Sequence, residues 1–276
     1  MKEENNDDYF EKQNPSILRS IGGLFTFTTI IPLNIYTTID EMAKMTWIWP
    51  VINGCIGILG AIIAYILIAV LNLDSLLAAC IIYGFFIWIN GFNHLDGLMD
   101  FGDGVMVHGD AEKKLSIMKD PINGVGGIAT MFVIAIITIA SYNSIIGLDT
   151  FNLMVPGYFL MIIIAEMSAK VSLITCCVFS KSSNEGIGKF FIEYMNVRKY
   201  FIGIIIALII AILLSWPINL SVGIFGIIGG IFGGVLVAST AEKHLGFANG
   251  DVLGSSNEIG RLCSLLAMII TITCLI

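Results

Sequence analysis

The sequence predicts an all-α, polytopic integral membrane protein: a bundle of seven or eight transmembrane helices with its polar loops on the cytoplasmic side. Two observations predict this fold. Hydrophobic residues make up 57% of the 276 residues and charged residues only 13%, a balance that a water-soluble domain of this size does not have. The apolar residues also gather in long runs, which three long polar segments and several short turns separate.

The apolar runs, taken in order, give the expected spans. Residues 1–20 are polar and acidic and are expected to form a disordered tail, and residues 21–276 a single membrane domain. The run 21–36 is short and is broken by Pro32, so it is either a re-entrant segment or an eighth span. Seven clear spans follow, at 47–71, 75–92, 125–146, 154–179, 201–216, 218–240 and 259–276.

Lysine and arginine are distributed unevenly among the loops. The segments 93–126, 180–200 and 241–261 hold three, four and two of them, whereas 72–74, 147–153 and 217–219 hold none. This alternation places the three long polar segments in the cytoplasm and predicts a multi-pass protein of the cell membrane. The net charge of −7 excludes nucleic acid as a partner. The sequence leaves open whether the chain forms a homo-oligomer.

A cluster of carboxylates follows the second clear span. Asp96, Asp100 and Asp103 lie at positions i, i+4 and i+7, within about 60° of one another on a helix. Their mutual repulsion is removed by a divalent cation, and oxygen ligands without a nearby cysteine favour Mg²⁺ or Mn²⁺. A solvated acidic loop is the alternative. Part of the cluster is expected on a loop, because three glycines disfavour a continuous helix (Gly97, Gly102 and Gly104).

The segment after this cluster predicts a second polar constellation. Residues 109–121 are expected to form a short amphipathic helix, with Asp110 as its N-cap and Pro121 as its stop. Lys119 and Asp120 follow it, beside the glycine-rich stretch 123–127. A cation next to a carboxylate at such a stretch can bind a phosphate and a metal together.

Further candidates lie elsewhere in the chain. Asn249, Asp251 and Glu258 belong to the third polar segment, on the side expected for the acidic cluster. Glu166 and Lys170 lie at i, i+4 inside an apolar run, where they form either a neutralised structural pair or part of a substrate pocket. His94 precedes the carboxylates and is placed either to orient one of them or to accept a proton.

Three motifs together resemble the adenosylcobinamide-GDP ribazoletransferase family, also called cobalamin (5′-phosphate) synthase. They are HLDGLMDFGD at 94–103, LSIMKD at 115–120 with GVG at 124–126, and NGDVLG at 249–254. They follow the order of the family, and the resemblance covers the chain from residue 17 onward. The pair Pro121–Ile122 and Phe247 depart from the pattern, and Lys170 and Lys181 stand in regions where arginines are common.

The resemblance implies that residues 21–276 form a membrane catalytic domain. The reaction would join adenosylcobinamide-GDP and α-ribazole, or its 5′-phosphate, to give adenosylcobalamin or its 5′-phosphate with release of GMP. Asp96, Asp100 and Asp103 would hold Mg²⁺. The implied catalytic groups are Asp120, Lys119 and His94, and the implied substrate-binding residues are Asn123, Gly124, Lys170, Lys181, Asn249, Asp251 and Glu258.

Three other classes of protein share some of these features. A CDP-alcohol phosphotransferase needs Asp-Gly-x-x-Ala-Arg, whereas Asp96-Gly97 is followed here by Leu-Met-Asp. An aspartate-rich prenyltransferase needs a second acidic motif, for which only Asp251 and Glu258 are available. A transporter would show midplane charges and an internal repeat, but the sequence shows only the Glu166–Lys170 pair and no repeat.

Overall fold

The computed structural model describes residues 17–148 and 155–275. Regular structure in these residues is helical, apart from one isolated bridge between Ser182 and Ala248. Residues 1–16 of the expected tail lie outside the described residues, and α1 (Ile17–Thr28) begins within the last part of that tail. The expected all-α architecture is confirmed.

Six helical segments are long and apolar enough to cross a membrane. The apolar helix α4 (Ser75–Ile89) and the polar helix α5 (Asn93–Met106), with a bend of 91° between them, add a seventh crossing if the pair is counted as one span. The first of the six segments, 46–70, contains α3 (Trp49–Tyr65) and the π-helical turn η3 (Ile66–Val70). The other five are α7 (Val125–Gly147), α8 (Gly157–Phe179), α10 (Val197–Ser215), α11 (Leu220–His244) and α12 (Gly250–Leu275).

Of the two counts that the sequence left open, seven agrees with the structure. The run 21–36 does not form an eighth span, because α1 has only 12 residues and the chain after it is not helical until α2 (Ile39–Ala43). The third polar segment is also much shorter than expected. Helix α11 continues to His244 and α12 begins at Gly250, so most of 241–261 is helix rather than loop.

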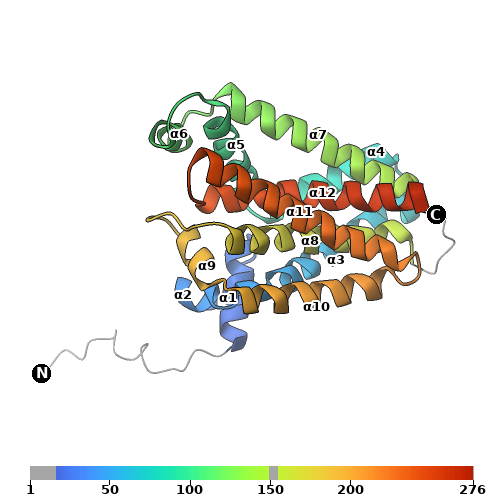
Figure 1. Cartoon of the computed structure of the whole chain (residues 1–276). Helices are drawn as coiled ribbons and strands as arrows, with labels where there is room; N and C mark the ends of the chain where they lie inside the picture. The colour runs from blue at the N-terminus through green and yellow to red at the C-terminus, as the bar shows by residue number, and fades with distance from the viewer. Residues whose placement is uncertain (1–16, 149–154, 276) are drawn as a thin grey trace, which may run out of the picture.

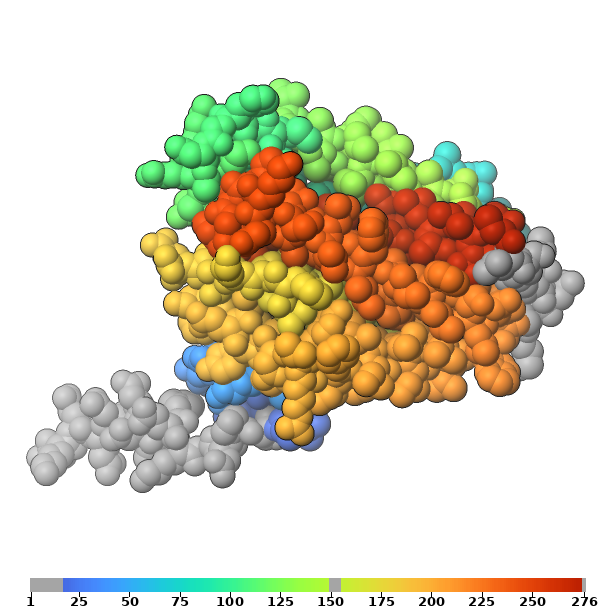
Figure 2. Space-filling model, viewed as in Figure 1, coloured from blue at the N-terminus to red at the C-terminus, as the bar shows by residue number. Residues whose placement is uncertain are grey.

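The central element of the bundle is α8. Its side chains are almost all buried, and it packs against α3, α10, α11 and α12. Glycines permit the closest approaches: a Cβ at Gly230 would lie 2.6 Å from the Ser168 carbonyl oxygen, and one at Gly233 would lie 2.8 Å from the Gly260 Cα. Helices α10 and α11 cover the face seen in Figure 2 and expose apolar side chains such as Leu213.

The polar elements gather at one end of the bundle. Helices α1, α2, α5, α6 (Ala111–Met118) and α9 (Gly188–Tyr194) all lie there, with α1 and α5 running across the direction of the long helices (Figure 1). The turn between α10 and α11 and the C-terminal end of α12 lie at the opposite end. The expected grouping of the three polar segments on one side of a multi-pass protein is therefore confirmed.

Candidate active site

The acidic cluster lies on a continuous helix, and the expectation that part of it is on a loop is wrong. The three glycines of α5 are needed for packing. A Cβ at Gly97 would lie 2.8 Å from the Asp251 carbonyl oxygen, one at Gly102 would lie 2.7 Å from the Thr130 hydroxyl, and Gly104 faces Met118. The glycines thus bring α12, α7 and α6 against one short helix, at a cost in intrinsic helix propensity.

Asp103 differs from the other carboxylates of α5. It is buried, and its two oxygens accept hydrogen bonds from the backbone N–H groups of Gly124 at 2.6 Å and Gly127 at 2.8 Å. These donors belong to the first turn of α7, where a carboxylate is favoured by the free N–H groups and by the helix dipole. Gly124 therefore contacts the acidic cluster itself, since a Cβ there would clash with Asp103.

Asp96, Asp100 and Asp251 lie together at the contact between α5 and the start of α12. The backbones touch at Gly97 and Asp251, and again where a Cβ at Gly254 would lie 3.2 Å from the His94 Cα. Partial burial raises the pKa of Asp100 to about 6, and the charges of Asp251, Asp96 and Asp103 add to this effect. These carboxylates repel one another, and a cation among them would relieve that repulsion.

The donor set is suitable for a hard divalent cation. It offers carboxylate oxygens, and in the described residues no ion pair occupies Asp96, Asp100 or Asp251. Within residues 17–148 and 155–275, however, no three His, Cys, Asp or Glu side chains converge into a preformed cage. Any ion here would need further oxygen ligands from water or substrate, which is usual for Mg²⁺.

A pocket of about 330 Å³ opens beside these carboxylates. Asp96, Asp251, Asn93 and His94 line its polar side, and apolar side chains line the other side. A carboxylate of α5 and one of α12, which are far apart in the sequence, therefore face the same space.

His94 and Lys170 form a buried polar pair at this pocket. The His94 Nε2 lies 2.9 Å from the Lys170 Nζ, and the His94 Nδ1 is buried without a partner. Burial, together with the positive charge of Lys170, holds the pKa of His94 well below its usual value, so the imidazole is neutral. His94 thus lines the pocket and is held there by Lys170.

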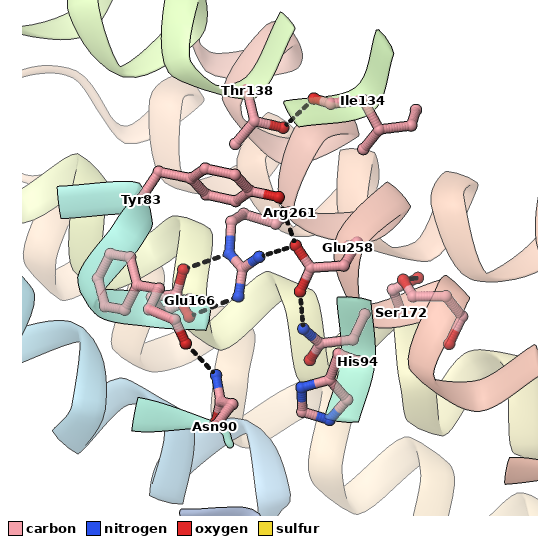
Figure 3. A network of polar contacts seen from close by, with 12 residues as sticks. Tyr83, Asn90, His94, Ile134, Thr138, Glu166, Ser172, Glu258 and Arg261 are labelled. Carbon is pink, nitrogen blue, oxygen red and sulfur yellow. Dashed lines mark hydrogen bonds and ion pairs between the residues drawn. The ribbon is translucent and has the colours of Figure 1, made fainter. Parts of the chain in front are cut away.

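The expected pairing of Glu166 with Lys170 does not form. The two carboxylate oxygens of Glu166 accept from Arg261, at 2.5 Å from Nε and 3.2 Å from Nη2, and Arg261 also donates to Glu258 (Figure 3). Tyr83 donates to Glu258 at 3.2 Å. Glu258 thus belongs to a network inside the bundle and not to the pocket that the sequence assigned to it.

Arg261 is the buried charged side chain that sequence reasoning missed. It is fully buried between Glu166 of α8 and Glu258 of α12. The sequence placed it at the end of a polar loop, because the start of α12 is rich in Gly, Ser and Asn. One signal was present: Glu258 and Arg261 are at i, i+3, the spacing of an ion pair on a helix.

The remaining candidates lie around the pocket at the polar end. The Asn249 side chain caps α12, accepting from the Val252 N–H at 3.1 Å and donating to Asp251 at 2.8 Å. With Lys119 it lines a neighbouring pocket of about 290 Å³. Lys119 is exposed and lies 3.6 Å from Glu185.

Three of the remaining candidates are at the surface and line neither pocket. The exposed Lys181 pairs with Glu242 at 2.8 Å, which raises the pKa of the lysine. Asp120 accepts from the Ile122 N–H at 2.9 Å in a local turn, and Asn123 is exposed beside it. The structure therefore gathers Asp96, Asp100, Asp251 and His94 and leaves these three at the periphery.

The fold and the site define a class: a multi-pass, all-α membrane protein with a carboxylate-lined pocket at the polar end of its bundle. Residues 20–269 match the model of the family described as cobalamin-5-phosphate synthase, and the chain belongs to that family. The resemblance found in the three motifs is confirmed, and the phosphotransferase, prenyltransferase and transporter alternatives are not favoured.

Curated relatives cover almost the whole chain. A protein of Methanosarcina mazei is 33% identical over 259 residues, which are 90% of this chain and 90% of the relative. One of Picrophilus torridus is 35% identical over 257 residues, 92% of this chain and 98% of the relative. Both are named adenosylcobinamide-GDP ribazoletransferase. No solved structure matches the chain.

Proposed function

We propose that this chain is an adenosylcobinamide-GDP ribazoletransferase, an enzyme of cobalamin biosynthesis that joins adenosylcobinamide-GDP to α-ribazole or its 5′-phosphate. Family membership supports the reaction. The observation that carries the site is the contact between α5 and α12, because it places Asp96 and Asp251 in one pocket. We assign the pocket to the cytoplasmic side of the cell membrane, from the distribution of lysine and arginine.

The reaction is a phosphoryl transfer. The 5′-oxygen of the acceptor attacks the phosphorus that carries the cobinamide, a new O–P bond forms, and the bond from this phosphorus to the bridging oxygen breaks. GMP leaves with the electron pair, and the proton of the 5′-hydroxyl passes to a carboxylate of the pocket. Such a transfer depends mainly on positioning and on neutralisation of charge, which this chain's cations and donors can supply.

We assign the following roles. Asp96 and Asp100 hold Mg²⁺ or Mn²⁺, and Asp103 fixes α5 against α7. When bound, the ion neutralises charge on the diphosphate of the donor substrate. His94 lines the pocket and is positioned by its contact with Lys170 to meet a phosphate of the substrate.

The neighbouring pocket is suited to the leaving nucleotide. Lys119 and Asn249 line it, and Asn249 also contacts Asp251, so the two pockets adjoin. We propose that Lys119 meets the phosphate that leaves with guanosine. An exposed lysine can do this without the cost of desolvation that a buried cation would bear.

The test is turnover of labelled adenosylcobinamide-GDP and α-ribazole by membranes that contain the protein, with Mg²⁺. We expect a corrinoid product and GMP, loss of both with a chelator, and recovery with Mg²⁺ or Mn²⁺. Asp96→Asn and Asp100→Asn should lower kcat by about two orders of magnitude or more while the protein still inserts. Glu112→Gln, an exposed acid of α6, is the matched control. Near-normal rates in either aspartate variant contradict the metal assignment.

A further inference from the structure

Three aromatic rings form one wall of the larger pocket, in which Phe27 is 39% exposed and Trp49 and Phe191, at 3% and 2%, pack behind it. The Trp49 and Phe191 ring centroids are 4.9 Å apart, and those of Phe27 and Phe191 are 5.2 Å apart. The rings come from three elements, α3, α9 and α1, and all three residues line the pocket. Two of these elements are short helices at the polar end, so the wall stands at the mouth of the bundle and shares the pocket with Asp96 and Asp251.

The polar groups on this wall are already paired with one another. The Trp49 Nε1–H donates to the Thr28 hydroxyl at 2.6 Å, and that hydroxyl donates to the Leu24 carbonyl at 2.7 Å. The neighbouring lining residues are Leu173, Ile187 and Leu253. A ligand bound here would therefore contact aromatic and aliphatic side chains. A ring with several polar groups on its edge would lose the hydrogen bonds that those groups make to water.

From this geometry we infer that the wall of Phe27, Trp49 and Phe191 is the binding site for the aromatic base of α-ribazole. The inference rests on the function proposed above. The base is a benzimidazole, whose only free hydrogen-bonding atom is one ring nitrogen. Guanine, the other base in the reaction, has five polar edge groups. A base stacked on this wall would direct its ribose, and hence the attacking 5′-oxygen, toward the carboxylates of the same pocket.

The size of the pocket supports the same occupant. A volume of about 330 Å³ is near the lower end of the range of small-molecule sites, which is roughly 300–1,000 Å³. A nucleoside fits within such a volume, whereas the corrin macrocycle does not. The corrinoid must then approach from outside the pocket, with only its diphosphate reaching Asp96.

The experiment compares Michaelis constants for the two substrates. Phe27→Leu should raise the KM for α-ribazole about tenfold, the effect of losing one base–aromatic stack, and leave the KM for adenosylcobinamide-GDP unchanged. Phe27→Tyr, which keeps the ring, should stay near wild type. Phe232→Leu, on the exposed surface of α11, is the matched control for the loss of a phenyl group. A rise in the KM for adenosylcobinamide-GDP alone would overturn the assignment.

Equilibrium binding separates this inference from the proposed function. If the wild-type protein shows no turnover, the proposed function fails, and binding of α-ribazole to the purified protein then decides the inference by itself. We expect saturable binding that Phe27→Leu weakens and that guanosine does not displace. The inference is refuted if guanosine displaces α-ribazole at similar concentrations. It is also refuted if the variant binds α-ribazole as tightly as the wild type does, or if the wild type does not bind it.

Discussion

Residues of the same type serve different purposes at this site. Asp96 faces the pocket, whereas Asp103, seven positions further on, has both oxygens bound to N–H groups of α7. The spacing of the sequence places both on one helical face, but it does not show which neighbouring helix each one meets. The same holds for Lys170, which lies one turn from Glu166 and yet pairs with His94. Side-chain partners inside a bundle depend on helix rotation, which short-range spacing does not determine.

Arg261 is predicted to be essential for stability. Arg261→Met leaves Glu166 and Glu258 as buried, uncompensated carboxylates, and it should lower the free energy of unfolding by about 3–5 kcal/mol. The measurement is the thermal midpoint of the protein purified in detergent. Glu242→Gln breaks only the exposed pair with Lys181 and should leave the midpoint close to that of the wild type.

A combined variant sharpens the test of this network. Arg261→Met together with Glu166→Gln and Glu258→Gln removes all three charges and should recover part of the loss, because the main cost is that of leaving charges unpaired. If Arg261→Met has the same midpoint as Glu242→Gln, the network does not stabilise the bundle.

At the level of elements, the close contact between α5 and α12 at Gly97 is predicted to be needed for both stability and activity. Gly97→Ala places a Cβ 2.8 Å from the Asp251 carbonyl oxygen, so either α5 or α12 must move. We expect a loss of about 1–3 kcal/mol in stability and a lower kcat, because Asp96 and Asp251 then separate. Gly84→Ala in α4 is the control, since its Cβ would meet nothing within 4 Å and alanine favours helix. Wild-type kcat in Gly97→Ala would show that this apposition is not needed.

The sequence predicted the elements better than their contacts. The apolar runs located the six long apolar segments and α4, and Asp110 caps α6 as expected, accepting from the Lys113 N–H at 2.9 Å. The continuous α5 and the early start of α12 were missed. In both helices, glycines that disfavour helix formation are retained because they allow close packing, as at Gly97 and Gly254, and only the tertiary structure shows these contacts.

At the scale of the whole molecule, the chemistry collects at one end of an apolar bundle. The pocket is formed by α5, by the starts of α3 and α12, by α1 and α9, and by Leu173 of α8, while the buried Arg261 network links α8 to α12 inside the bundle. This arrangement lets a membrane-embedded protein present charged groups to soluble substrates without placing them in the hydrocarbon region. The side of the membrane that this end faces then decides which pool of substrates the enzyme uses.

The sidedness is predicted from the positive charges of the polar segments and is testable by cysteine labelling. Ser116→Cys lies on exposed α6 at the polar end, and Gly147→Cys lies at the exposed opposite end of α7. In intact cells, a membrane-impermeant maleimide should add label to Gly147→Cys but not to Ser116→Cys, relative to the wild-type chain with its six native cysteines. After permeabilisation both should react. Labelling of Ser116→Cys in sealed cells would place the pocket outside the cytoplasm, where nucleotide-activated substrates are not made, and the proposed orientation would be wrong.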